Sequence, residues 1–292
     1  MIYKELGKTK EKVSAIGLGT WQLGEITESK VDAIRAGLDN GIDFIDTAEI
    51  YGTEDLVGEA IKNRKKPFIA TKVWPSNFKY DSVIKACESS LKRLGVPQID
   101  LYQLHWPNKS IPIKETMSAM ERLVEEGKIR YIGVSNFRPE EVDEANKALK
   151  KSEIVSDQVE YSLIVRGAEK KILPYCKKKG LSLIAYSPLG HKKLVSNKHP
   201  ELTETLKEIG EKYGRSPVQV ALNWLISMDN VIAIPKASSK EHVLEDAGAA
   251  DFVMTKGDIA KLNEVSAKFQ SKSLYQMVGP LVSVYLKFKR IF

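Results

Sequence analysis

The sequence predicts an α/β fold, a (β/α)8 TIM barrel with an N-terminal β-hairpin and a C-terminal extra helix and tail. Three observations predict it: short apolar runs alternate with amphipathic helical patterns, the alternation occurs eight times, and no Pro/Gly/Ser-rich linker interrupts it. Strands that alternate with helices form a parallel sheet, and eight such units close into a barrel. We therefore expect residues 1–292 to form a single domain.

The hairpin is expected first, because residues 3–6 and 12–16 flank the turn sequence Gly-Lys-Thr-Lys. The eight barrel strands are the apolar runs at residues 16–19, 42–45, 68–70, 99–104, 129–134, 154–159, 181–186 and 231–234. The helices that follow them are expected at residues 29–40, 54–63, 81–94, 113–126, 139–150, 168–179, 216–227 and 239–249. A longer insertion separates the seventh strand from its helix.

Two segments fall outside this repeat. Residues 191–199 form a basic loop after the seventh strand, and the chain beyond Phe252 carries a helix near residues 257–268 and an apolar tail at 269–292. We expect the tail to pack across the barrel or to form part of a pocket wall. The alternative is a membrane-surface or subunit contact, which the tail's basic residues favour. The Gly-Pro pair at residues 279–280 opposes that alternative, because it interrupts any long helix.

The charge and the cysteine content of the chain indicate which binding partners and which cellular compartment to expect. The net charge of +7 and the pI of about 9.1 favour an anionic cofactor or substrate. Basic and acidic residues are interleaved along most helices, so no nucleic-acid partner is expected. Two cysteines indicate a reduced, cytoplasmic chain without disulfides. The start of the chain has no signal-peptide pattern, and no apolar run is long enough to span a membrane. Homo-oligomerisation is left open.

Four residues at or just after the ends of three consecutive strands carry the chemistry: Asp46, Tyr51, Lys72 and His105. In a TIM barrel that end of the sheet is the catalytic mouth. A phenol has a pKa near 10 in water, and a nearby cation lowers it. Lys72 can supply that cation, Asp46 can hold Lys72, and His105 can orient a carbonyl oxygen. The set suits proton donation to a carbonyl that gains negative charge, and it implies a hydride-donating cofactor.

The sequence around these residues resembles sequences of the aldo-keto reductase family from the first strand to the last. The matching motifs, in order, are GTWQLG at 19–24, DTAEIYG at 46–52, TKVW at 71–74, LHWP at 104–107, GVSNF at 133–137, AYSPLG at 185–190 and IPKASS at 234–239. The resemblance implies Tyr51 as proton donor, Lys72 paired with Asp46, and His105 as the residue that orients the substrate. It implies no metal site.

The resemblance also implies which residues hold the cofactor and the substrate. Those assigned to the nicotinamide and pyrophosphate are Gly19, Thr20, Ser135, Asn136, Gln158, Tyr186, Ser187 and Leu189. Among them, Tyr186 matches the aromatic residue on which the nicotinamide ring stacks. Trp21 and Trp106 match substrate-pocket walls, and core packing is the alternative for both.

At the adenosine end the sequence departs from the family pattern. Lys236 is present and suits a 2′-phosphate, but His242 stands where NADP-preferring members place an arginine. Ser238, Ser239 and Lys240 can compensate for the missing arginine, and Glu245 and Asp246 match adenine contacts. We expect NADP(H) as cofactor, with weaker discrimination against NAD(H) than usual.

The resemblance thus implies an NADP(H)-dependent reductase of aldehydes and ketones, acting on small carbonyl substrates. One alternative is a nucleotide-binding regulatory module of the same superfamily with little turnover, and the intact set of four residues argues against it. A phosphate-binding barrel, such as an isomerase or an aldolase, is the other. It lacks support because no Gly-rich phosphate loop follows the seventh and eighth strands.

Overall fold

A computed structural model of the chain describes residues 1–191, 194 and 198–272. Most of the predicted tail and most of the basic loop after the seventh strand lie outside these residues. The expectations for the tail as a pocket cover or a contact surface therefore stay predictions.

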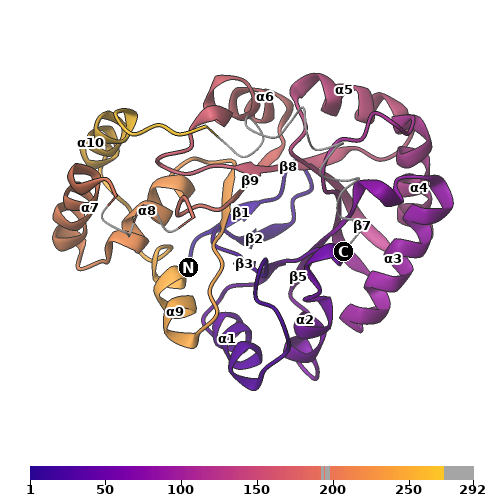
Figure 1. Cartoon of the computed structure of the whole chain (residues 1–292), viewed down its shortest axis with the longest axis horizontal. Helices are drawn as coiled ribbons and strands as arrows, with labels where there is room; N and C mark the ends of the chain where they lie inside the picture. Colours follow the sequence, from indigo (N-terminus) through magenta and orange to yellow (C-terminus); the bar gives the residue numbers. More distant parts are fainter. Residues whose placement is uncertain (192–193, 195–197, 273–292) are drawn as a thin grey trace.

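Eight parallel strands form the sheet, so the predicted (β/α)8 barrel is confirmed (Figure 1). They are β3 (Leu18–Gly19), β4 (Phe44–Asp46), β5 (Phe68–Val73), β6 (Ile99–Leu104), β7 (Ile129–Ser135), β8 (Ile154–Glu160), β9 (Ser182–Tyr186) and β10 (Val231–Ile234). Each strand pairs with its neighbour in sequence order. The first and last strands meet through a parallel bridge between Ile16 and Ala233, so the sheet comes close to full closure.

Ten α-helices are described, and Figure 1 shows them arranged around the strands. They are α1 (Glu28–Asp39), α2 (Glu54–Ile61), α3 (Tyr80–Leu94), α4 (Ile113–Glu125), α5 (Pro139–Ala148), α6 (Ile172–Lys179), α7 (Pro200–Tyr213), α8 (Pro217–Ile226), α9 (Lys240–Gly248) and α10 (Lys256–Ala267). Local signals set their ends. Gly95 adopts a left-handed conformation at the end of α3, and Ser216 caps α8 by accepting a hydrogen bond from the backbone N–H of Gln219.

One helix was not predicted, and one helical prediction needs correction. The insertion after the seventh strand contains α7, which begins with a proline and buries Leu202, Leu206 and Ile209 at helical spacing. The predicted helix at 168–179 is two elements, a 3₁₀ turn at Gly167–Lys170 and then α6. The extra C-terminal helix is confirmed as α10.

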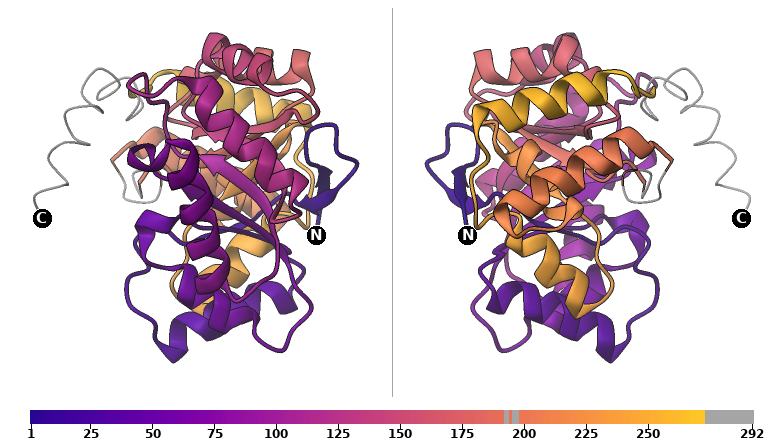
Figure 2. Two further views of the ribbon diagram at one scale, coloured as in Figure 1. Left: turned by 90° about the vertical axis from the view of Figure 1, so that its right-hand side faces the viewer. Right: turned by 90° about the vertical axis from the view of Figure 1, so that its left-hand side faces the viewer.

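The predicted hairpin is also confirmed: β1 (Tyr3–Glu5) pairs antiparallel with β2 (Lys12–Ser14). Figure 2 shows it at one end of the barrel. Its Leu6 and Val13 join the apolar cluster that fills the barrel interior. The buried Lys4 donates hydrogen bonds to the carbonyls of Ile226, Met228 and Val231 at distances of 2.5–2.8 Å. The hairpin therefore closes the amino-terminal end of the barrel, which leaves the carboxyl end for a site.

A larger apolar cluster lies between the strands and the surrounding helices. Within the described ranges, no helix is both long enough and apolar enough to cross a membrane.

Candidate active site

The barrel brings the four predicted catalytic residues to one place. Asp46 ends β4, Lys72 lies in β5, and His105 follows β6 directly. Tyr51 lies in a 3₁₀ turn, Glu49–Tyr51, that follows β4 and carries the phenol back over the strand ends. The carboxyl ends of neighbouring parallel strands lie at the same end of the barrel. Residues at or just after the ends of β4, β5 and β6 are therefore close together.

The centre of the cluster is a buried ion pair. Lys72 Nζ donates to Asp46 Oδ1 over 2.5 Å and to the backbone carbonyl of Thr47 over 2.8 Å. Tyr51 lies on the outer side of this pair, with its hydroxyl 3.5 Å from Lys72 Nζ and 3.2 Å from His105 Nε2. The Lys72 and Asp46 side chains are almost completely removed from water. The four side chains therefore form one connected chain of contacts, from Asp46 through Lys72 and Tyr51 to His105.

The Tyr51 phenol is a weaker acid in the folded protein than the sequence analysis expected. Burial raises the pKa of Tyr51 well above its usual value, and the charge of Asp46 raises it further. The lowering expected from Lys72 is outweighed, because burial is the largest effect on the pKa of this phenol and the charge of Asp46 acts in the same direction. Like an ordinary phenol, Tyr51 keeps its proton at neutral pH, and the protonated form is the one that a proton donor requires.

His105 is neutral at physiological pH. Burial lowers the pKa of its imidazole well below the usual value, and the nearby Lys72 lowers it further. The indole of Trp74 stands edge-on to its ring at a centroid distance of 5.0 Å. Among the described residues, Nδ1 has no hydrogen-bond partner. A neutral imidazole held in this way can offer a hydrogen bond from Nε2 without adding a charge to the site.

Four polar residues predicted for the nicotinamide end lie beside this cluster. Tyr186 donates from its hydroxyl to Asn136 Oδ1 over 3.1 Å, and Asn136 Nδ2 lies 3.0 Å from Ser135 Oγ. Ser135 Oγ donates in turn to the backbone carbonyl of Gln158 over 2.9 Å. Asn136 adopts a left-handed backbone conformation, with φ of 63°, which turns its amide back over the strand ends. The four residues form one network at the ends of β7, β8 and β9.

Gly19 and Thr20 have structural roles that compete with cofactor contact. The backbone N–H of Gly19 donates to the carbonyl of Pro235 over 2.8 Å, and a Cβ at this position would lie 2.9 Å from the carbonyl oxygen of Ile234. The buried hydroxyl of Thr20 lies 3.1 Å from the carbonyl of Asp46 and 2.9 Å from Thr53 Oγ1. Gly19 thus joins the first strand to the segment after the last, and Thr20 joins it to the segment around β4. The role of both residues in cofactor binding stays a prediction.

The two predicted substrate-wall tryptophans differ in exposure. Trp21, on the loop between β3 and α1, is 44% exposed, whereas Trp106 is 9% exposed. The ring of Trp21 stands edge-on to His191 at a centroid distance of 6.3 Å, and His191 Nε2 lies 3.1 Å from Glu160 Oε1. These contacts place the β3–α1 loop next to the β9–α7 loop that holds Ser187 and Leu189.

The predicted adenosine-end residues lie on the loop after β10 and on α9. Lys236 and Ser238, on the loop, and His242, in the first turn of α9, are exposed. Glu245 is half-buried, whereas Asp246 is buried. The first three are therefore accessible to a charged ligand. The structure places none of the five in contact with the catalytic cluster.

Burial raises the pKa of Asp246 to about 8, with a smaller contribution from Glu245. The folded chain thus keeps a proton that the unfolded chain releases near pH 4, so stability falls as pH rises between those values.

We expect Asp246→Asn to remove this dependence of stability on pH. The free energy of unfolding of Asp246→Asn minus that of wild type should be larger at pH 8 than at pH 5, by at most about 4 kcal/mol. Urea unfolding at both pH values measures it, with the exposed Asp229→Asn as control. Equal pH slopes for Asp246→Asn and wild type would contradict the assignment.

Two residues at the site were missed by the sequence analysis. Gln103, fully buried in β6, donates to Asp46 Oδ2 over 3.2 Å, and Trp74 packs on His105. The signal for Gln103 was an amide inside an otherwise apolar strand, two positions before His105, and therefore on the same face. For Trp74 the signal was a large aromatic residue two positions after Lys72.

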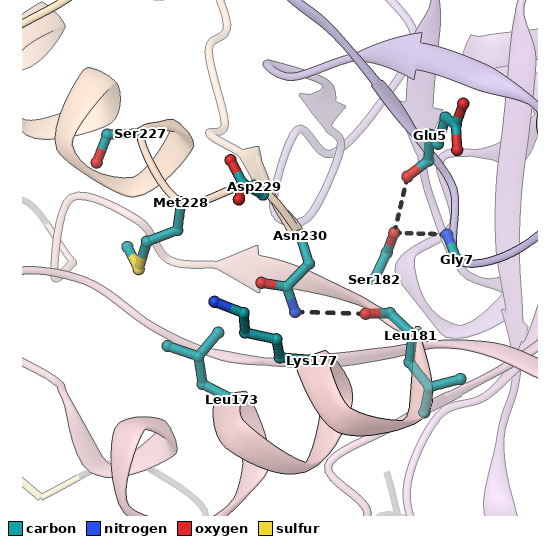
Figure 3. A pocket seen from close by; sticks show the side chains of 11 residues that line it. Glu5, Gly7, Leu173, Lys177, Leu181, Ser182, Ser227, Met228, Asp229 and Asn230 are labelled. Atoms are coloured by element: carbon teal, nitrogen blue, oxygen red, sulfur yellow. Dashed lines mark hydrogen bonds between the residues drawn. The ribbon is translucent and has the colours of Figure 1, made fainter.

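A hollow at the other end of the barrel contains none of the predicted site residues (Figure 3). Ser182, at the start of β9, accepts a hydrogen bond from the backbone N–H of Gly7 over 2.8 Å and lies 3.3 Å from the carbonyl of Glu5. Asn230 lies 3.4 Å from the carbonyl of Leu181. The bonds of Ser182 fasten the hairpin to the amino-terminal end of the barrel.

A buried acid–base cluster at the carboxyl end of a (β/α)8 barrel is the layout of a TIM-barrel enzyme. A model of the Aldo/keto reductase family matches residues 15–267. The chain therefore belongs to the aldo/keto reductase family.

Individual relatives agree with this assignment. The chain is 37% identical over 271 residues to "Methylglyoxal reductase YeaE" of Escherichia coli (strain K12), covering 90% of this chain and 95% of that protein. The crystal structure of the thermostable aldo-keto reductase Tm1743 is 40% identical, with a TM-score of 0.83 over 91% of this chain and 100% of that chain. An aldo/keto reductase from Klebsiella pneumoniae in complex with NADP and acetate is 37% identical, with a TM-score of 0.82 over 92% of this chain and 97% of that chain.

Proposed function

We propose that this protein is an NADP(H)-dependent reductase that converts aldehydes and ketones to alcohols, with Tyr51 as the proton donor. The observation that carries the proposal is the connected set of Asp46, Lys72, Tyr51 and His105, with hydroxyl-to-nitrogen distances of 3.2 and 3.5 Å around the phenol. The set suits a carbonyl oxygen that gains negative charge, because a hydroxyl donor and two nitrogen groups converge on one point.

Each residue has a defined task in this proposal. The Tyr51 hydroxyl gives its proton to the carbonyl oxygen as negative charge develops there. Lys72 lies 3.5 Å behind that hydroxyl and stabilises the phenolate that remains. Asp46 holds Lys72 in place through the 2.5 Å contact. Neutral His105 orients the carbonyl oxygen with a hydrogen bond from Nε2, and because it is neutral it does not compete as an acid.

The chain's own residues fit a nicotinamide cofactor, which supplies hydride when bound. Ser135, Asn136 and Gln158 offer amide and hydroxyl groups that match a carboxamide in kind. Tyr186, half-buried beside Asn136, offers an aromatic face for stacking. The exposed Lys236 offers a positive charge for a 2′-phosphate.

Cofactor choice gives a separate prediction. Lys236→Ala should weaken NADPH binding about tenfold and leave NADH binding within about twofold, because a lysine contacts the phosphate only as a point charge. Fluorescence titration of both cofactors measures the two dissociation constants, and the exposed Lys256→Ala at the start of α10 is the matched control. An equal loss for the two cofactors would contradict a 2′-phosphate contact by Lys236.

The test of the proposed function is a titration with NADPH and NADH, followed by a panel of carbonyl compounds. Methylglyoxal is the first compound to try, because the Escherichia coli relative is named as its reductase. Simple aromatic aldehydes and ketones complete the panel. NADPH consumption that depends on the carbonyl supports the proposal. NADPH binding without turnover on any compound would favour the regulatory module instead, and no binding would contradict both.

A further inference from the structure

Asp46 is held from two sides, and only one side is the lysine. Its Oδ1 accepts the hydrogen bond from Lys72, while Oδ2 accepts one from Gln158 Nε2 over 2.7 Å and one from Gln103 Nε2 over 3.2 Å. Gln158 Nε2 also lies 3.5 Å from Gln103 Oε1. The four side chains come from β4, β5, β6 and β8, and each is at most 2–3% exposed.

The chemistry of the carboxylate fixes the orientation of both amides. An ionised carboxylate can only accept hydrogen bonds, so each glutamine must turn its NH₂ group toward Asp46. For Gln158 this leaves Oε1 to face away from the carboxylate, and it accepts no hydrogen bond from any of the described residues. An amide oxygen presented in this way can accept from a carboxamide N–H.

A glycine makes this network possible. Gln103 in β6 and Gln158 in β8 are separated by β7, where Gly133 is the register partner of Gln103. A Cβ on Gly133 would lie 2.9 Å from Gln103 Cγ and 2.7 Å from Ser156 Oγ. Any larger residue there would push the Gln103 side chain away from the middle of the barrel. Because Gly133 has no side chain, the space beside it lets the Gln103 side chain pass over β7 and contact Gln158. We call this space the corridor.

We propose that Gln103 is a positioning residue that couples the proton-donating cluster to the nicotinamide site, by fixing the Asp46 carboxylate and the Gln158 amide together. Gln103 touches neither substrate nor cofactor. It acts through Asp46, which holds Lys72, and through Gln158, whose oxygen it keeps pointed away from the carboxylate. The inference rests on the function proposed above and adds a residue to it.

The first test is Gln103→Met, which keeps the side-chain length but loses the amide. We expect the Kd for NADPH, measured by fluorescence titration, to rise about tenfold and kcat with methylglyoxal to fall about tenfold. The matched control is Ser156→Ala, because Ser156 flanks the same corridor and its hydroxyl has no hydrogen-bond partner within the described part of the chain. This control should change neither quantity more than twofold.

A double-mutant cycle separates positioning from mere packing. In an Asp46→Asn background, Gln103→Met should change the Kd for NADPH by less than twofold, because the partner that it acts through is already altered. If the two effects on Kd multiply independently, Gln103 only fills space. A Gln103→Met protein that matches wild type in both Kd and kcat would likewise overturn the inference.

Gln103→Glu keeps the proposal testable if Gln103→Met does not fold. A protonated glutamic acid can still donate to Asp46, whereas an ionised one repels it. NADPH affinity of this variant should therefore fall as pH rises, relative to wild type, and a parallel pH profile would contradict the inference. Wild type that binds no NADPH would contradict the proposed function and this inference together. NADPH binding that neither Gln103 variant alters would contradict the inference alone.

Discussion

Tyr51→Phe is expected to lower kcat for carbonyl reduction by about 10²–10⁴-fold, the usual contribution of a positioned general acid. Among the described residues, the phenol touches both Lys72 and His105, at 3.5 and 3.2 Å, and it keeps its proton at neutral pH. Phenylalanine fills the same space but carries no proton to give. NADPH oxidation in the presence of methylglyoxal measures the loss.

A chemically identical change elsewhere provides the control. Tyr102 is fully buried on the helix side of β6, and its hydroxyl has no partner among the residues that the structure describes. Tyr102→Phe should leave kcat within about twofold. The Kd for NADPH should be nearly unchanged in both variants, because in the proposed function the Tyr51 hydroxyl contacts the substrate and not the cofactor. If Tyr51→Phe keeps near-wild-type kcat, the assignment of the proton donor is wrong.

Lys72→Met is expected to have two large effects, on activity and on stability. Removing the ammonium leaves the Asp46 carboxylate buried without its partner, which typically costs about 3–5 kcal/mol in the free energy of unfolding. The same change removes the charge that stabilises a phenolate on Tyr51, so kcat should fall about as far as in Tyr51→Phe. Urea unfolding and steady-state kinetics measure the two effects on one preparation.

The double variant Asp46→Asn/Lys72→Met separates these effects. The double variant has no unpaired buried charge, and such a charge is what makes Lys72→Met costly. Its free energy of unfolding should therefore be closer to that of wild type than that of Lys72→Met. Activity should not return. A double variant no more stable than Lys72→Met would show that the pair matters through packing rather than through charge.

The barrel could be predicted from sequence because its signals are local. Each parallel strand is buried on both faces and reads as an apolar run, and glycine stops such as Gly95 and Gly180 mark helix ends. The insertion after β9 was harder. Helix α7 starts at a proline within a polar stretch, and its apolar residues lie against α8 and α10, far from the repeating pattern.

The residue types of the catalytic cluster were predictable, but their electrostatics were not. A sequence shows that Lys72 can approach Tyr51. It does not show that Asp46 lies 2.5 Å from that lysine and offsets its charge, nor that burial dominates the phenol's pKa. Gln103 was missed for a related reason. Its importance comes from a contact across β7 that depends on Gly133, and pairing across strands is invisible to periodicity.

The central claim, that a dinucleotide supplies the hydride while Tyr51 supplies the proton, has one direct measurement. NADPH deuterated at C4 is mixed with the protein and methylglyoxal in ordinary water, and the alcohol is examined by mass spectrometry and NMR. We expect a product with one deuterium on the former carbonyl carbon and an exchangeable proton on its oxygen, formed far more slowly by Tyr51→Phe. An alcohol without deuterium on carbon, or no alcohol from any carbonyl tested, would contradict the proposed function.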